Sequence, residues 1–157
     1  DSSQQLNRPH SVEGKAFDSL ACFAESRADN IRVRCVDDVD WDGECYDVVL
    51  LTNVLSAIPL PRTRLAVMRN IASLLKPGGQ AYIVTQFANS HFRAWSKNGK
   101  AEQYQDGWLV RSARGASFYG LIGPDKLVQY CKRTGLEVVE SGTRCHGNAA
   151  FVEATVP

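Results

Sequence analysis

One segment of the sequence, YDVVLLTNVL at residues 46–55, constrains the fold more than any other. Its middle, residues 48–51, is apolar without a break. A strand with one solvated face would alternate apolar and polar residues, whereas a strand that is apolar on both faces is typical of the centre of a parallel sheet. The chain is therefore expected to fold around this strand, with helices packed beside it.

Helical and strand patterns alternate along the rest of the chain. Apolar spacing predicts three helices, at residues 13–26, 59–76 and 123–134. Further strands are predicted at residues 31–36, 80–86, 136–140 and 148–156, the last two as an antiparallel pair. This order predicts an α/β fold with a doubly wound, mostly parallel sheet and a C-terminal antiparallel strand, in a single domain over residues 1–157.

Composition excludes several classes of protein. The 157 residues carry a formal net charge of +1, so no global charge attracts nucleic acid or a membrane surface. The sequence has no run of about 18 apolar residues that would span a membrane. Its five cysteines are widely spaced and form no C-x-x-C motif, which argues against a zinc site or a disulfide framework and favours the reducing cytoplasm.

Several short motifs, taken in order, resemble the class I S-adenosylmethionine-dependent methyltransferases. They are YDVV at residues 46–49, NVL at 53–55, IP at 58–59, LLKPGG at 74–79 and GLEVV at 135–139. The resemblance covers residues 31–157 and implies a Rossmann-like fold, S-adenosylmethionine as the cofactor, and methyl transfer as the activity. In that family the fourth strand, its following helix and the fifth, sixth and seventh strands carry these motifs.

The sequence departs from the family at its front. The family has a first strand and a G-x-G-x-G turn that lets the backbone approach the cofactor, but Gly14 and Gly43 stand alone here. The chain is therefore expected to be a C-terminal portion, a fragment that binds the cofactor weakly or not at all by itself. Residues 31–36 would then need pairing partners from upstream sequence, from another chain, or from rewired pairing. The alternative function is a truncated or degenerate domain that serves as a non-catalytic binding or assembly module.

Two groups of residues are candidates for cofactor binding. The resemblance places an adenine contact after the third strand, at Asp37, Asp38 and Val39, although a solvated acidic loop explains the same residues. The second group, Thr52, Asn53 and Val54, leaves the end of the apolar strand. Ligands in open α/β sheets bind at the carboxyl ends of strands, and the resemblance puts the methionine part of the cofactor there.

Residues 87–122 form a long segment rich in aromatic and basic side chains. A segment of this length is expected to be functional, as a lid or recognition element, or else a structural cover with a hairpin in which residues 108–111 pair near 117–119. The candidate substrate-binding residues are His91, Trp95, Trp108, Arg111 and Tyr119. His91 is considered as a general base, but the sequence identifies no catalytic residue.

A small molecule is the expected methyl acceptor. Residues 53–62 and 106–119 are also faintly similar to methyltransferases that accompany DNA phosphorothioate modification, so nucleic acid is the alternative acceptor.

Overall fold

The computed structural model describes residues 9–19, 22–23, 26–27, 45–87, 91–113, 115–143 and 149–157. By their internal contacts the residues of the chain group into two compact units, Asp1–Trp41 and Asp42–Pro157. A single domain over residues 1–157 stays a prediction. The predicted strand at residues 31–36 lies outside the described residues.

The first unit contains a small antiparallel hairpin. Strands β1 (His10–Val12) and β2 (Lys15–Phe17) pair across a two-residue turn. Both turn residues have positive φ, 52° at Glu13 and 78° at Gly14, as a tight hairpin turn requires. The helix predicted to begin at residue 13 is therefore wrong at its start, because the local turn preference of Glu13-Gly14 outweighed the apolar spacing beyond it.

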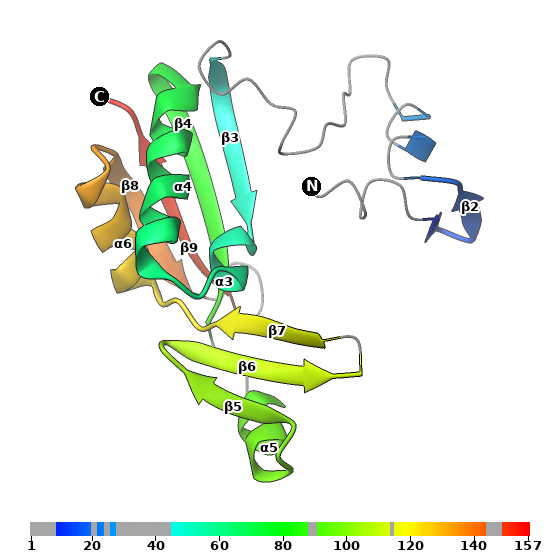
Figure 1. Ribbon diagram of the computed structural model, residues 1–157. Helices are drawn as coiled ribbons and strands as arrows, with labels where there is room; N and C mark the ends of the chain where they lie inside the picture. Colours follow the sequence, from blue (N-terminus) through cyan, green and yellow to red (C-terminus); the bar gives the residue numbers. More distant parts are fainter. Residues whose placement is uncertain are drawn as a thin grey trace. The chain divides into compact units, whose positions relative to one another are not determined.

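The second unit is built on a four-stranded sheet with the order β3-β4-β9-β8 (Figure 1). Its strands are β3 (Tyr46–Thr52), β4 (Leu75–Gln86), β9 (Ala149–Thr155) and β8 (Glu137–Thr143). β3 and β4 are parallel, while β4 with β9 and β8 with β9 are antiparallel. The predicted antiparallel pair is confirmed. The expectation of mostly parallel pairing is not met in the described sheet, because the reversed strand β9 lies between β4 and β8.

Two helices pack on one face of this sheet. α4 (Pro61–Leu74) and α6 (Pro124–Arg133) each have a proline in the first turn, where the absence of an N–H does no harm. Gly135, at φ 80°, ends the second of them as expected. Both helices contribute to a buried core that includes Met68, Ile83, Leu127 and Val152.

The other face of the sheet is open in this part of the chain. Val48 is 55% exposed and Leu50 is 69% exposed, although both belong to the apolar strand β3. The doubly wound arrangement predicts helices on both faces, but the two long helices that the structure describes, α4 and α6, cover the same one (Figure 1). In the part of the chain that is described, no helix is both long enough and apolar enough to cross a membrane.

The LKPGG motif is absorbed into a strand. We expected it to form a turn before a strand at residue 80, whereas β4 already begins at Leu75. The register with β3 shifts between the pairs Tyr46–Leu75 and Val48–Gln80, so the extra residues form an irregularity. Gly78, at φ 75°, donates its N–H to the carbonyl of Val156 at 3.1 Å, which ties the irregularity to the end of the chain.

A separate three-stranded sheet follows β4 (Figure 1). Helix α5 (His91–Lys97) leads into β5 (Ala101–Tyr104), β6 (Gly107–Ser112) and β7 (Gly115–Gly120). These strands are antiparallel, and Trp108 pairs with Tyr119 and Val110 with Ser117, so the predicted hairpin is confirmed. The two ends of the inserted segment, residues 87–122, lie close together, because the N–H of Ile122 donates to the carbonyl of Gln86 at 2.9 Å.

Candidate functional site

A hollow of about 490 Å³ lies on the open face of the sheet, toward the carboxyl end of β3. It is lined by Leu50, Thr52, Asn53, Tyr82, Val84 and Ala149. Two of the predicted cofactor residues, Thr52 and Asn53, therefore lie together at the place where ligands bind in open α/β sheets. The volume falls within the roughly 300–1,000 Å³ of small-molecule sites.

The backbone presents Asn53 in an unusual conformation. Its φ is 60°, in the left-handed region, and its N–H donates to the carbonyl of Val84 at 2.8 Å. Asn is one of the few residues that adopt this conformation readily. Asn53 precedes helix α3 (Val54–Ala57), but its side chain makes no capping hydrogen bond. The exposed amide, which can both donate and accept, is thus not used to cap the helix.

Of the remaining predicted cofactor residues, Val54 is the one that the structure describes. Val54 begins α3 and is 43% exposed, but it does not line the hollow. Asp37, Asp38 and Val39 lie outside the described residues, so the adenine contact stays a prediction.

Beside the hollow, polar side chains of α3 and β4 hold the base of the inserted segment. The buried hydroxyl of Ser56 accepts a hydrogen bond from the N–H of Gln86 at 3.0 Å. Thr85 is fully buried and donates to the carbonyl of Ile122 at 2.9 Å. These bonds join the carboxyl end of β4 to α3 and to the return of the chain from the three-stranded sheet.

Arg64, Asp106 and Lys126, which we call the charged clasp, connect that sheet to the helices. Arg64 of α4 is fully buried and donates to both carboxylate oxygens of Asp106, at 2.6 and 2.8 Å. Lys126 of α6 donates to the same carboxylate at 2.6 Å. Arg64 also donates to the carbonyl of Ile58 at 2.7 Å and to the hydroxyl of Tyr130 at 3.4 Å. Every member of the clasp is thus paired.

The pairing shifts the pKa values of Asp106 and Arg64, and each shift favours the charged form. Burial raises the pKa of Asp106, but hydrogen bonds from Arg64 and Lys126 outweigh it and bring the pKa from the usual 3.8 down to about 2. Burial lowers the pKa of Arg64, and its bonds to Asp106 and Tyr130 outweigh that effect and raise the pKa. Asp106 and Arg64 therefore both stay charged across the physiological range.

Sequence reasoning did not single out the charged clasp, although one signal was present. Arg64 falls four residues before Met68 and seven before Ile71, on the apolar stripe of the helix. A charged residue on such a stripe indicates a buried ion pair. No local signal identifies Asp106 as its partner, because the two residues are 42 positions apart.

The predicted substrate residues separate onto different surfaces. Trp108 and Tyr119 are directly paired across β6 and β7, so they share a face, and both are half-buried. Arg111 is three residues from Trp108 and thus lies on the other face, where it pairs with Glu102 at 3.2 Å in an exposed contact. Trp95 belongs to α5 and is 38% exposed, and His91 begins that helix.

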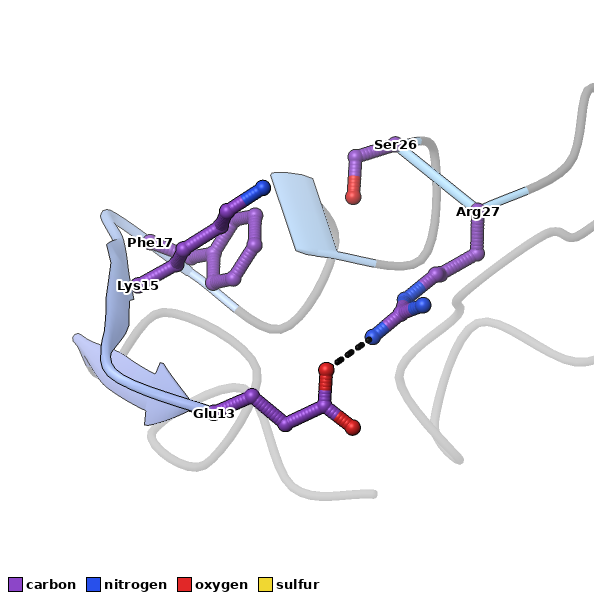
Figure 2. A pocket seen from close by; sticks show the side chains of 5 residues that line it. All are labelled: Glu13, Lys15, Phe17, Ser26 and Arg27. Carbon is purple, nitrogen blue, oxygen red and sulfur yellow. Dashed lines mark ion pairs between the residues drawn. The ribbon is translucent and has the colours of Figure 1, made fainter.

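Two other hollows are not lined by residues at the carboxyl ends of the parallel strands. One of about 760 Å³ includes Gly135, Leu136 and Glu137, at the amino end of β8 and so at the wrong end of the strands. The other, of about 250 Å³, belongs to the first unit and is lined by Glu13, Lys15, Phe17, Ser26 and Arg27 (Figure 2). Its Glu13–Arg27 ion pair is 3.7 Å long and exposed. Among the described residues no group of three or more His, Cys, Asp or Glu could hold a metal ion.

Two solved structures have the same fold. The chain aligns with an S-adenosylmethionine-dependent methyltransferase from Methanosarcina mazei at TM-score 0.54 and 16% identity, over 80% of this chain and 66% of that one. It aligns with a 1,6-didemethyltoxoflavin-N1-methyltransferase from Burkholderia thailandensis at TM-score 0.52 and 16% identity, over 78% and 48% of the two chains. The latter was solved with 1,6-didemethyltoxoflavin and S-adenosylhomocysteine, the demethylated form of the predicted cofactor.

A curated relative is more similar in sequence. The uncharacterized protein YmfD of Escherichia coli strain K12 is 31% identical over 147 residues, which are 92% of this chain and 63% of YmfD. The chain thus spans less than two-thirds of the length of this relative.

The family model for a methyltransferase domain matches residues 4–141. This match includes β3, the LKPGG irregularity, the three-stranded sheet and α6. The prediction of class I methyltransferase ancestry, made from short motifs alone, is confirmed by the family match and by the shared fold. The chain belongs to the methyltransferase domain family.

Proposed function

We propose that this chain takes part in S-adenosylmethionine-dependent methyl transfer to a small molecule. The observation that carries the proposal is the hollow at the carboxyl end of β3, with Thr52 and Asn53 on its lining, in a chain of the methyltransferase domain family. The small-molecule acceptor is supported by the Burkholderia thailandensis enzyme of similar fold, whose structure holds 1,6-didemethyltoxoflavin.

The residues around the hollow suit the methionine part of the cofactor. The exposed amide of Asn53 offers both donor and acceptor groups, which match an ammonium and a carboxylate, and Thr52 adds a hydroxyl. When bound, the cofactor supplies a methyl group on a positively charged sulfur. The protein's part is to hold the acceptor atom in line with that methyl group, and alignment of this kind lowers the barrier without a dedicated acid or base.

We assign the acceptor to the three-stranded sheet, on the face of Trp108 and Tyr119. The opposite face carries Phe118, which is buried, and the guanidinium of Arg64 lies 5.8 Å from the centre of its ring. That face is therefore occupied by the protein itself around Phe118, while its exposed part carries the Arg111–Glu102 ion pair. Half-buried aromatic rings are typical linings of small-molecule sites.

Two alternative functions, a non-catalytic binding module and methyl transfer to nucleic acid, have less support. A non-catalytic binding module gains no support from the comparisons, and the faint similarity to DNA-modification methyltransferases has no counterpart in the relatives described above. A nucleic acid acceptor would require a basic surface, yet Arg111 of the sheet is already paired with Glu102.

Titration with S-adenosylmethionine, followed by backbone amide NMR, tests the proposal. The absence of the glycine-rich turn from this sequence predicts weak binding or none. The hollow favours the first outcome, so we expect weak but saturable shifts at Leu50, Thr52 and Asn53. Absence of any shift up to about 10 mM, where binding is worth only about 3 kcal/mol, would contradict the proposed function. So would shifts confined to the first unit.

Substitution of Asn53 separates the role of its amide from that of its backbone. Asn53→Ala removes the amide and places Ala in the left-handed region, at a cost of about 1 kcal/mol of stability, whereas Asn53→Gly removes the amide without that strain. We expect both variants to bind S-adenosylmethionine several-fold more weakly and only the Ala variant to lose stability. Asn70→Ala, on an exposed position of α4, is the control: it should leave binding unchanged, and it should not lower stability because Ala favours a helix more than Asn does.

A further inference from the structure

We propose that the charged clasp of Arg64, Asp106 and Lys126 is a positioning device that fixes the three-stranded sheet as a rigid wall of the acceptor site. The clasp lies where the β5–β6 turn meets the first turns of α4 and α6. That the sheet borders an acceptor site rests on the proposed function. That the charged clasp fixes the position of the sheet can be tested without any acceptor.

The geometry of the clasp favours one orientation of the sheet. The planar guanidinium of Arg64 meets both oxygens of Asp106, and a two-pronged contact of this kind permits little rotation. Lys126 approaches the same carboxylate from a second helix. The turn that carries Asp106 is thus held from two elements at once, which a single contact would not achieve.

Because Arg64 is buried, its guanidinium must be fully hydrogen-bonded in the folded state. Its side chain has no exposed surface, and removing a guanidinium from water is costly unless its donors are satisfied. Apolar residues of the same volume, in place of a buried ion pair, often stabilise the folded state equally well or better. The ion pair therefore contributes a defined geometry more than stability, which is the property that a binding wall needs.

A glycine on β7 makes room for the guanidinium. A Cβ atom at Gly120 would lie 2.9 Å from Nη2 of Arg64 and 3.3 Å from the carbonyl oxygen of Ser56. Gly120 therefore lets β7 lie directly against the arginine. The backbone adds a further tie at the same place, because the N–H of Leu121 donates to the carbonyl of Asp106 at 3.1 Å.

These contacts lie at one end of the three-stranded sheet. The other end, where Ser112 and Gly115 pair, is made of exposed residues. A lid that closes over the acceptor would need to hinge at its base, which is the end that the charged clasp holds. The sheet therefore meets the acceptor as a wall already in place.

Hydrogen exchange measured by mass spectrometry on the whole chain tests the charged clasp. In Lys126→Met we expect amides of residues 107–113 and 115–120 to exchange roughly tenfold faster, while those of β4 and β9 keep their rates. Asp106→Asn should accelerate the same amides and also those of β4 and β9, because it leaves the buried Arg64 without its charged partner. Lys126→Arg should restore the slow exchange, because it returns a cation to the carboxylate. Glu102→Gln, which removes the exposed carboxylate of the same sheet, is the control and should leave exchange unchanged.

Two outcomes would overturn the inference. Unchanged exchange of residues 107–113 and 115–120 in Lys126→Met would show that the sheet is held without the clasp. Equal acceleration everywhere in that variant, which keeps the buried Arg64–Asp106 pair, would show a purely global role in stability. A parallel titration of each protein with S-adenosylhomocysteine tests the proposed function separately. If the unaltered chain does not bind S-adenosylhomocysteine, the proposed function is contradicted, but the exchange result still decides whether the charged clasp fixes the sheet.

Discussion

Asp106 accepts hydrogen bonds from both cations of the charged clasp, so its ionisation is coupled to folding. Its pKa in the folded chain is lowered to about 2 from the usual 3.8. A lowered carboxyl pKa stabilises the folded state at pH values above the unfolded pKa, and this contribution is lost as the pH falls through the folded value. The relevant window thus runs from about pH 4 down to about pH 2. Because Asp106 is 23% exposed and partly screened by solvent, we expect a contribution of about 1–2 kcal/mol.

Removing the outer cation should raise the pKa of Asp106 without abolishing the shift. In Lys126→Met the carboxylate loses one charged donor but keeps Arg64, so its pKa should lie between about 2 and the usual 3.8. Carbon NMR titration of the Asp106 carboxyl group measures this directly. Lys76→Met is the matched control, since Lys76 pairs at 2.9 Å with Asp47 in an exposed contact far along the sequence from Asp106. An unchanged pKa in Lys126→Met would show that Lys126 contributes no charge stabilisation.

Some residues of the candidate site could be predicted from the sequence, and others could not. Thr52 and Asn53 could be predicted because they leave the carboxyl end of an apolar strand, where ligands bind in open α/β sheets and where the family resemblance puts the methionine part of the cofactor. Arg64 and Asp106 were missed because their pairing depends on how a distant turn folds back onto a helix. Arg111 was grouped with Trp108 as a substrate residue, whereas the alternation of side chains along β6 places the two on opposite faces.

The two faces of the main sheet should respond differently to the same substitution. Val152 of β9 is fully buried beneath the helices, and Val48 of β3 is 55% exposed on the other face. Truncation to Ala removes the same two methyl groups and a similar strand preference in each case. We therefore expect Val152→Ala to cost about 2–3 kcal/mol of unfolding free energy and Val48→Ala less than about 1 kcal/mol.

Urea denaturation of both variants measures this difference. A comparable loss in Val48→Ala would show that the open face is covered in solution, and the open surface near the hollow would then need another explanation. The m-value of each variant shows whether the truncation has altered how much surface is exposed on unfolding.

Elements with strong local signals were predicted well. Prolines mark the starts of α4 and α6, Gly135 marks the end of α6, and hydrophobic spacing identified their buried faces. The helix predicted from residue 13 failed at its start because Glu13 and Gly14 make a tight hairpin turn. The LKPGG motif was predicted as a turn before the strand, yet pairing with β3 and the bond to Val156 draw it into β4. Local propensity did not indicate that tertiary contact.

At the level of the whole molecule, sheet order could be inferred only through the family resemblance. Strand patterns alone do not say that β9 inserts between β4 and β8, and this insertion changes two of the three pairings to antiparallel. The continuous apolar run of β3 indicated burial on both faces, but in the structure only Val49 and Leu51 pack against the core. In the sheet that the structure describes, β3 is an edge strand, so the same run leaves an apolar surface there that invites association between molecules.

This apolar edge should govern solubility near neutral pH. The formal net charge is +1 and the isoelectric point is about 7.8, so repulsion between molecules is weakest slightly above neutrality. We expect light scattering to rise near pH 8 and to fall several-fold in Val48→Lys, because a lysine on β3 interrupts the apolar edge. Val139→Lys adds the same charge at a residue of β8 that is 60% exposed, and it serves as the matched control. An equal effect of both substitutions, or no effect of either, would show that the β3 edge has no special part in the association of the molecules.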